Sequence, residues 1–381
     1  MPTAAELRDE FLLEPSVTFL NHGSFGACPR PVFERYQAWQ LELEREPVEF
    51  LGRRLSGLLA AARERLADAL GADPGDLVFV PNATSGVNVA ARALRLGPED
   101  EVLATDLEYG ACDLLWMHLC GGRYVRAPIP LPLRNADDAV EALFAARTAR
   151  TRAVFVSHVT SETALRLPVE RIVARARAEG LATIVDGAHA PGYVPLDLGA
   201  LWADFYAGNC HKWLCAPKGA GFLHVRPEHQ DAVDGLIVGW GYGDDATFVT
   251  RSQEQGTRDP SAYLTVPAAL DWQAERSWDE VRDRCRALAL ELRERLAELT
   301  GLEPLADPAF VGQMISAPLP PGHGKELQQR LWEEHRIEVP VFPRDGRPLI
   351  RASFQGYNDE RDLERLLAAL APLLDQTSAP E

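Results

Sequence analysis

The period of the hydrophobic positions changes along the chain, and these changes predict where helices and strands lie. Residues 32–70 place apolar side chains at helical spacing with Arg and Glu between them, which predicts helix. Short apolar runs then alternate with helical stretches. The predicted strands are 77–80, 101–104, 153–156, 181–185 and 222–225, and the predicted helices between them are 87–94, 136–147 and 169–179.

Strands that alternate with helices predict an α/β fold whose sheet is mostly parallel and covered on both faces. Beyond about residue 256 the pattern predicts a smaller α+β domain, with helices at 277–299, 325–334 and 358–374 and a strand near 349–353. We therefore expect an N-terminal arm at 1–18 that packs on the smaller domain, a large domain at 19–255 and the smaller domain at 256–381. Residues 376–381 are expected to fray.

Composition excludes several classes of protein. The net charge of -17 argues against a nucleic-acid partner, because such binding depends on basic surfaces. No apolar run approaches the roughly 20 residues that a membrane-spanning helix needs, and the first residues carry no targeting signal, so we expect a cytoplasmic protein without a membrane partner. The six cysteines form neither a CxxC pair nor a zinc-type spacing, which favours reduced thiols and no metal.

Lysine is scarce, and its positions are informative. Only Lys212, Lys218 and Lys325 occur among the 39 basic residues, so arginine supplies nearly all of the positive charge. Arginine cannot replace lysine where an amine must lose its proton, as in Schiff-base formation. The glycine-flanked, aromatic turn around Lys212 could desolvate that amine, although a surface-loop lysine is the alternative.

Two further segments carry candidate chemistry. Asp186 follows the strand at 181–185, at the edge of the sheet where α/β folds bind ligands, and could hold a protonated ring nitrogen or simply cap the next turn. The segment 78–88 predicts a strand, a small-residue turn and a helix start. Its free amides, with the hydroxyls of Thr84 and Ser85, could bind a phosphate, but both residue types are also ordinary helix caps.

The order of these segments resembles a known family. A Thr-containing phosphate turn, VDGAH at 185–189, then His-Lys at 211–212 and Pro-Lys-Gly at 217–219 are similar to the class V aminotransferase family of fold type I enzymes, which use pyridoxal 5'-phosphate (PLP). FLNHGSFG at 19–26, SHVTS at 157–161 and the segment 208–221 resemble its isopenicillin N epimerase-like branch. The resemblance extends from residue 19 to the final helix and implies a large domain with a seven-stranded, mostly parallel sheet.

The resemblance also implies roles for individual residues around the cofactor ring. Lys212 would form the Schiff base with PLP, and Asp186 would pair with its pyridine nitrogen. His189 would lie near the phenolic oxygen, with Ser161 as a second candidate there. Tyr109 matches the position at which relatives stack an aromatic or imidazole ring on the cofactor.

Other implied contacts lie at the phosphate and at the substrate. Thr257 would complete the phosphate site of a partner subunit, which implies a homodimer with shared sites. Arg351 would clamp the substrate carboxylate, and Asn21 and His22 are further expected substrate contacts. The expected phosphate ligands within the chain are Ala83, Thr84, Asn209 and His211.

Four functions remain open at this stage. An epimerase or racemase acting at Cα of an amino-acid-type small molecule ranks first, followed by a carbon-sulfur lyase acting by β-elimination. Transamination is not excluded, and a non-catalytic role would require a broken site, whereas Lys212 and Asp186 are both present. Residues 339–349 contain no cysteine, which argues against the persulfide chemistry of cysteine desulfurases.

Overall fold

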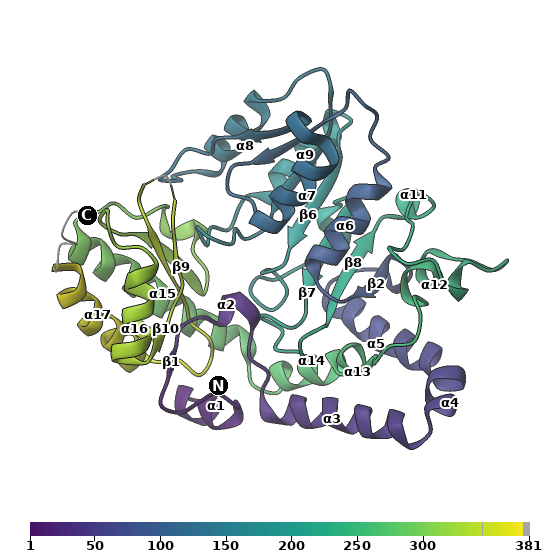
Figure 1. Cartoon of the computed structure of the whole chain (residues 1–381), viewed down its shortest axis with the longest axis horizontal. Coiled ribbons are helices and arrows are strands. Elements are labelled where there is room, and N and C mark those ends of the chain that lie inside the picture. The colour runs from purple at the N-terminus through teal and green to yellow at the C-terminus, as the bar shows by residue number, and fades with distance from the viewer. Residues whose placement is uncertain (345, 376–381) are drawn as a thin grey trace.

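The computed structural model describes residues 1–344 and 346–375, so the expected fraying of residues 376–381 lies outside it (Figure 1). Within the described residues, a seven-stranded sheet has the order β2-β8-β7-β6-β5-β3-β4. Strand β8 runs opposite to the other six strands of this sheet, so the predicted α/β fold with a mostly parallel sheet is confirmed. The strands are β2 (Leu77–Val80), β3 (Glu101–Thr105), β4 (Tyr124–Ala127), β5 (Thr151–Ser157), β6 (Ala182–Gly187), β7 (Phe205–Asn209) and β8 (Gly221–Val225).

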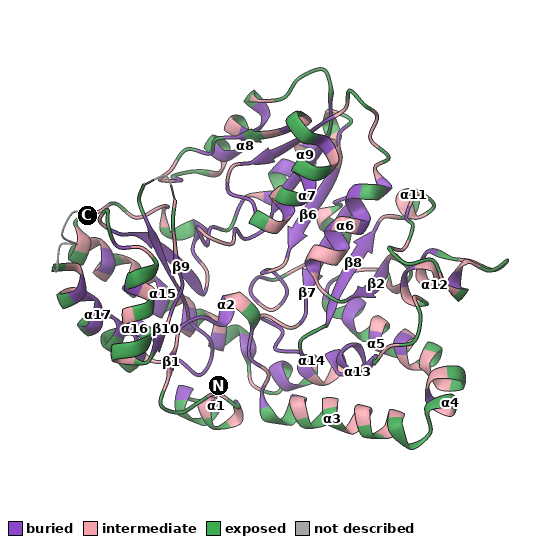
Figure 2. Ribbon diagram, viewed as in Figure 1, coloured by how far each residue is buried: buried purple, intermediate pink, exposed green. Residues whose placement is uncertain are grey.

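Helices cover both faces of this sheet, which explains its continuous apolar strands. On β5, Val154 and Val156 face one hydrophobic cluster, whereas Ala153 and Phe155 face another. Figure 2 shows the central strands buried and the outer helix surfaces exposed. The covering helices are α5 (Leu55–Ala69), α6 (Ala83–Ala93), α7 (Gly110–Cys120), α8 (Ala136–Ala145) and α9 (Val169–Ala178).

The predicted helix at 32–70 is wrong as a single element. It is divided into α3 (Arg30–Arg45), α4 (Pro47–Glu49), a π-helical segment (Phe50–Arg54) and α5. The break falls at Glu46, whose φ of -151° and ψ of 78° lie outside the helical region. Pro47 explains it, because a proline disfavours helical backbone in the preceding residue.

The smaller domain contains two short sheets. Strands β11 (Val341–Phe342), β12 (Leu349–Ser353) and β9 (Met314–Pro318) form an antiparallel sheet, and β1 (Thr18–Phe19) pairs with β10 (Ile337–Glu338). Figure 1 places this domain on the left. Its helices are α15 (Trp278–Thr300), α16 (Lys325–His335) and α17 (Glu360–Asp375).

Contacts of the N-terminal arm and of two helices near residues 261–274 show where these segments pack relative to the two domains. In the N-terminal arm, which includes α1 (Ala4–Glu10), Arg8 forms an ion pair with Asp362 of α17, with 2.9 Å between Nη2 and Oδ2. Helices α13 (Ser261–Leu264) and α14 (Val266–Ala274) pack against α3 and α5 of the large domain. These two helices thus pack on the large domain, although they follow the expected boundary at 255/256.

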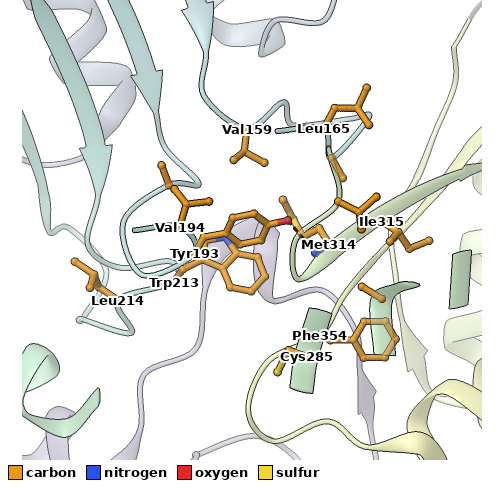
Figure 3. Packing of buried hydrophobic residues seen from close by; sticks show 14 of the residues in the cluster. Val159, Leu165, Tyr193, Val194, Trp213, Leu214, Cys285, Met314, Ile315 and Phe354 are labelled. Carbon is orange, nitrogen blue, oxygen red and sulfur yellow. Dashed lines mark hydrogen bonds between the residues drawn. The ribbon is translucent and has the colours of Figure 1, made fainter. Parts of the chain in front are cut away.

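Large buried side chains fill the seam between the domains. Figure 3 shows the rings of Tyr193 and Trp213 at its centre, with Val159 on one side and Met314 on the other. The two rings meet edge to face, with 4.8 Å between their centroids, and the Tyr193 hydroxyl accepts a hydrogen bond of 3.0 Å from the Met314 amide. This seam supports the backbone immediately behind Lys212.

Candidate active site

A cavity of about 200 Å³ lies at the carboxyl ends of β5, β6 and β7, the edge at which α/β sheets bind ligands. Most of the residues expected to bind a cofactor line it. Its walls consist of Ser24, Phe25, Asn82, Ala83, Thr84, Tyr109, Ser157, Val159, Ser161, Asp186, Ala188, His189, Asn209, His211 and Lys212. The sequence reasoning did not assign roles to Ser24, Phe25, Asn82 or Ser157, although the first two lie inside the FLNHGSFG segment.

Lys212 lies in the turn after β7, and the pKa of its amino group is lowered. Burial, reinforced by the positive charge of Arg351, lowers the pKa of Lys212 to about 7, while Asp186 acts in the opposite direction. The Nζ atom lies 3.1 Å from Nε2 of His189. A large fraction of the amine is therefore neutral near pH 7, as attack on an aldehyde requires.

The hydrogen bonds of His189 support the same conclusion. Nε1 of Trp213 donates to Nδ1 of His189 over 3.3 Å, so the proton of the neutral imidazole belongs on Nε2. Burial and nearby cations hold the pKa of His189 well below its usual value, which keeps the ring neutral. Its Nε2–H then donates to the lone pair of Lys212, and that lone pair exists only in the neutral amine.

Asp186 lies on β6, near its carboxyl end, and is buried. Its Oδ1 accepts a hydrogen bond of 2.9 Å from the Ala188 amide, and its Oδ2 lies 3.5 Å from Sγ of Cys112. Burial raises the pKa of Asp186, and the charge of Lys212 lowers it. Among the described residues no cation forms an ion pair with this buried carboxyl, which therefore suits a ligand that brings a positive charge, such as a pyridinium nitrogen.

The opposite end of the cavity combines a helix N-terminus with polar side chains. The Asn82 side chain caps α6 by accepting from the Ser85 amide, and Thr84 lies in the first turn, where amides lack helical acceptors. The Ala83 amide donates to Oδ1 of Asn209 over 2.8 Å, so Ala83 and Asn209 bind each other and define the shape of this end. An anion bound here would meet the Thr84 amide and hydroxyl.

His211 completes this end of the cavity. Its Nδ1 lies 2.9 Å from the Ala220 carbonyl, to which it donates, and this leaves Nε2 for a ligand. Burial lowers the pKa of His211 to about 4, an effect that a bound phosphate would oppose.

Arg351 is a buried guanidinium of the smaller domain that neutral groups hold in place. Its Nη1 donates to the Ser161 carbonyl over 2.7 Å, and its Nη2 donates to Oγ of Ser24 over 2.9 Å. Its Nε has no hydrogen-bond partner among the described residues. Burial lowers the pKa of Arg351 to about 10, so the side chain remains a cation that a ligand carboxylate would satisfy.

Asn21 and His22 lie behind the cavity wall. Oδ1 of Asn21 accepts from Ser24 and Arg351 over 2.6 and 3.5 Å, and its amide donates to Glu338 over 3.1 Å. His22 is fully buried, with Nδ1 3.0 Å from the Tyr357 hydroxyl and Nε2 3.0 Å from the Lys212 carbonyl. The structure therefore does not bring His22 to the expected substrate contact, and Asn21 orients Arg351 instead.

Tyr109 and Thr257 occupy different surroundings. Tyr109 precedes α7 and lines the cavity with 43% of its surface exposed. Thr257 is exposed and lies instead in a separate groove of about 640 Å³, together with Trp240, Arg258 and Tyr263. Within one chain, the structure does not bring Thr257 to the cavity of Lys212.

Comparisons with known proteins agree with this geometry. The aminotransferase class-V family model matches residues 29–366. The chain is 42% identical over 392 residues to isopenicillin N epimerase of Amycolatopsis lactamdurans, covering 97% of this chain and 98% of that protein. It is 29% identical to a probable chloroplastic L-cysteine desulfhydrase of Arabidopsis thaliana, covering 98% and 86% of the two chains. A solved variant of C-DES with glycine covalently linked to its PLP cofactor matches with a TM-score of 0.84 and 25% identity, over 96% of this chain and 98% of that one.

The resemblance inferred from the sequence motifs is thus confirmed over almost the whole chain. The cavity also fits the cofactor, since a buried amine with a pKa near 7, a buried acid and a helix N-terminus converge on one space. Among the described residues, no helix is long and apolar enough to cross a membrane. The chain belongs to the class V aminotransferase family, whose fold type I enzymes use pyridoxal 5'-phosphate.

Proposed function

We propose that this enzyme inverts the configuration at Cα of an amino-acid-type small molecule, with isopenicillin N or a close relative as substrate. The observation that carries the proposal is the Lys212 amine, which lies in a cavity between a buried acid, Asp186, and a buried cation, Arg351. The substrate class rests on the 42% identity to an isopenicillin N epimerase over nearly the full length of both chains.

Each end of the cavity has a proposed task. Asp186 takes the pyridine nitrogen, and Thr84 and His211 take the phosphate, while Ala83 and Asn209 shape that end. His189 and Ser161 lie toward the phenolic oxygen, and Tyr109 covers the ring. When bound, PLP supplies the electron sink that makes a Cα–H bond acidic.

The substrate is oriented by Arg351 and deprotonated by Lys212. The guanidinium clamps the carboxylate in two-pronged fashion, and Asn21 and Ser24 hold it in that orientation. With its amine free, Lys212 would serve as the base at Cα, and its lowered pKa suits proton transfer near neutral pH. Inversion needs a second proton donor on the opposite face, and we assign this task to Tyr109.

We also propose that the active unit is a homodimer. Thr257 is exposed in the single chain and lies far enough from its own cavity to line a different groove. An exposed apolar segment, Leu236 to Val238 with Trp240, borders that region, and Trp240 is 94% exposed. A second copy would cover these side chains and place its own Thr257 at the phosphate end.

A carbon-sulfur lyase is the second candidate. The L-cysteine desulfhydrase of Arabidopsis thaliana and C-DES are among the similar proteins. A β-elimination also requires only one base, because Lys212 can take the proton while the leaving group departs without help from a second face. The reaction is therefore compatible with this site even if Tyr109 only stacks.

Heavy-water experiments distinguish the two candidates. Wild-type holoenzyme is incubated in deuterium oxide with isopenicillin N, with L-amino acids and with cysteine conjugates, while Cα deuteration, configuration and pyruvate are followed. The epimerase predicts deuteration with inversion, and Tyr109→Phe should lose inversion but keep exchange. Pyruvate from cysteine conjugates without inversion of any substrate would establish the lyase, and neither exchange nor elimination with any compound would contradict both.

A further inference from the structure

A second buried acid, Glu108, lies beside Asp186 and outside the set of residues assigned so far. Its Oε2 accepts hydrogen bonds of 2.8 Å from the Ser157 amide and 2.6 Å from the Ser157 hydroxyl, and its Oε1 accepts one of 2.5 Å from the Thr105 hydroxyl. The side chain is 6% exposed. These three donors stabilise the ionised form of the carboxyl.

The position of Glu108 connects it with the cofactor cavity. Ser157, which donates two of these hydrogen bonds to Glu108, lines the cavity and is the direct neighbour of Asp186 across the β5–β6 pair. Neighbouring strands lie about 4.8 Å apart, so the carboxyl of Glu108 is held about one strand away from Asp186. Glu108 also immediately precedes Tyr109, so its side chain fixes the backbone from which Tyr109 reaches the cavity.

Burial and one neighbouring acid favour the neutral form of this carboxyl. Burial and the charge of Asp186 raise the pKa of Glu108 to about 8, whereas the bonds from Ser157 and Thr105 lower it. The other titratable groups that act on it or feel its charge are Asp186 on β6, Cys112 on α7 and Tyr124 on β4. A positive charge at the end of Asp186 would relieve this repulsion and favour the ionised form of both acids.

We propose that Glu108 is a positioning residue whose carboxylate acts with Asp186 to keep the proton on the pyridine nitrogen of the bound cofactor. The inference rests on the proposed contact between that nitrogen and Asp186. The second carboxylate adds negative potential without touching the cofactor, and in a water-poor interior such a charge acts over more than one strand spacing. A protonated ring deepens the electron sink on which Cα–H labilisation depends.

The test measures the ring nitrogen itself and does not depend on turnover. Wild type and Glu108→Gln are loaded with PLP carrying ¹⁵N in the ring, and the ¹⁵N shift is followed against pH by NMR. In Glu108→Gln the ratio of protonated to unprotonated ring nitrogen should fall by about tenfold at a given pH. This corresponds to a decrease of about one unit in the pKa of the pyridine nitrogen. Glu101→Gln is the matched control, because Glu101 is an equally buried acid at the other end of β3, bonded to Arg150.

Two further variants keep the test decisive. If Glu108→Gln fails to fold, Thr105→Val serves instead, because it retains the carboxyl and removes one hydrogen-bond donor. The ratio of protonated to unprotonated ring nitrogen should then fall by a smaller factor than in Glu108→Gln. Asp186→Asn should release the ring proton almost completely, and if it does not, the proposed cofactor placement itself is wrong. If the protonation of the ring nitrogen is unchanged in Glu108→Gln, or changes equally in Glu101→Gln, the proposed role of Glu108 is wrong.

Discussion

At the scale of single residues, the site depends on groups held in the protonation state that the chemistry needs. Lys212 is neutral in part because His189 and Trp213 form a chain of donors that ends on its lone pair. Arg351 keeps its charge although it is buried, because neutral oxygens surround it. The burial that makes these groups useful also makes them costly to the folded state.

The cost of burying Lys212 predicts a pH-dependent stability. Its pKa is about 7 in the folded cofactor-free protein and near 10.5 when unfolded, so the unfolded state binds more protons between these values. The contribution of this group to the free energy of unfolding therefore rises with pH above about 7, by up to about 1.4 kcal/mol per pH unit. Denaturant unfolding of wild type and Lys212→Met should show the stability advantage of the variant shrinking from pH 7 to pH 9. A difference that does not change with pH would contradict a lowered pKa.

Substituting the substrate clamp should separate binding of substrate from binding of cofactor. Arg351→Lys keeps the charge but loses the two-pronged contact, so kcat/KM should fall about 100-fold, equivalent to about 2.7 kcal/mol. The visible spectrum and the dissociation constant of PLP should remain those of the wild type. Steady-state kinetics and a PLP titration measure both, and a loss of PLP affinity equal to the loss of kcat/KM would show that Arg351 serves the cofactor instead.

At the scale of elements, the sequence predicted two of the three strands at whose carboxyl ends the site lies, β5 and β6, and it missed the contacts that stabilise the connections. The predicted strands at 77–80 and near 349–353 coincide with β2 and β12. Both are short, strongly apolar runs, which are typical of buried strands. β4 and β7 were not predicted. The π-helical segment and the buried position of His22 depend on contacts between distant segments, which no local pattern encodes.

The connection after α2 requires a glycine at position 26. Gly26 ends α2 (His22–Phe25) with a φ of +71°, and a Cβ atom there would lie 2.0 Å from the His211 carbonyl oxygen. Gly26→Ala should therefore destabilise the protein by about 2 kcal/mol or more and weaken PLP binding, because the Lys212 turn must move. Gly57→Ala, in an exposed turn of α5 with nothing within 4 Å, should instead stabilise by about 0.5–1 kcal/mol. Equal melting shifts for the two variants would contradict this account.

At the scale of the whole molecule, the single chain brings together every proposed ring contact but leaves Thr257 in a separate groove. The sequence could predict a role for Thr257 only through the family resemblance, since nothing in its local pattern indicates a phosphate. The packing of α13 and α14 on the large domain is likewise a contact between distant segments, which the change of helical pattern near residue 256 does not encode.

Shared active sites predict complementation between two inactive variants. Lys212→Ala removes the base, and Thr257→Arg should block the phosphate site of the partner subunit. A hybrid dimer contains one site with both native residues, so mixing the two inactive proteins under exchange conditions should restore up to about a quarter of wild-type activity, given random pairing of subunits. Activity that stays at zero although hybrids form, or a fully active monomer, would contradict the shared site.

The central claim is that Lys212 carries the cofactor and performs the chemistry at Cα. The most direct measurement is borohydride reduction of the PLP-loaded enzyme, followed by peptide mass spectrometry. We predict a phosphopyridoxyl group on Lys212 and none on Lys218, which is the built-in control because it lies only six residues further along the chain and is exposed. Label on Lys218, or no label with PLP in excess, would contradict the account.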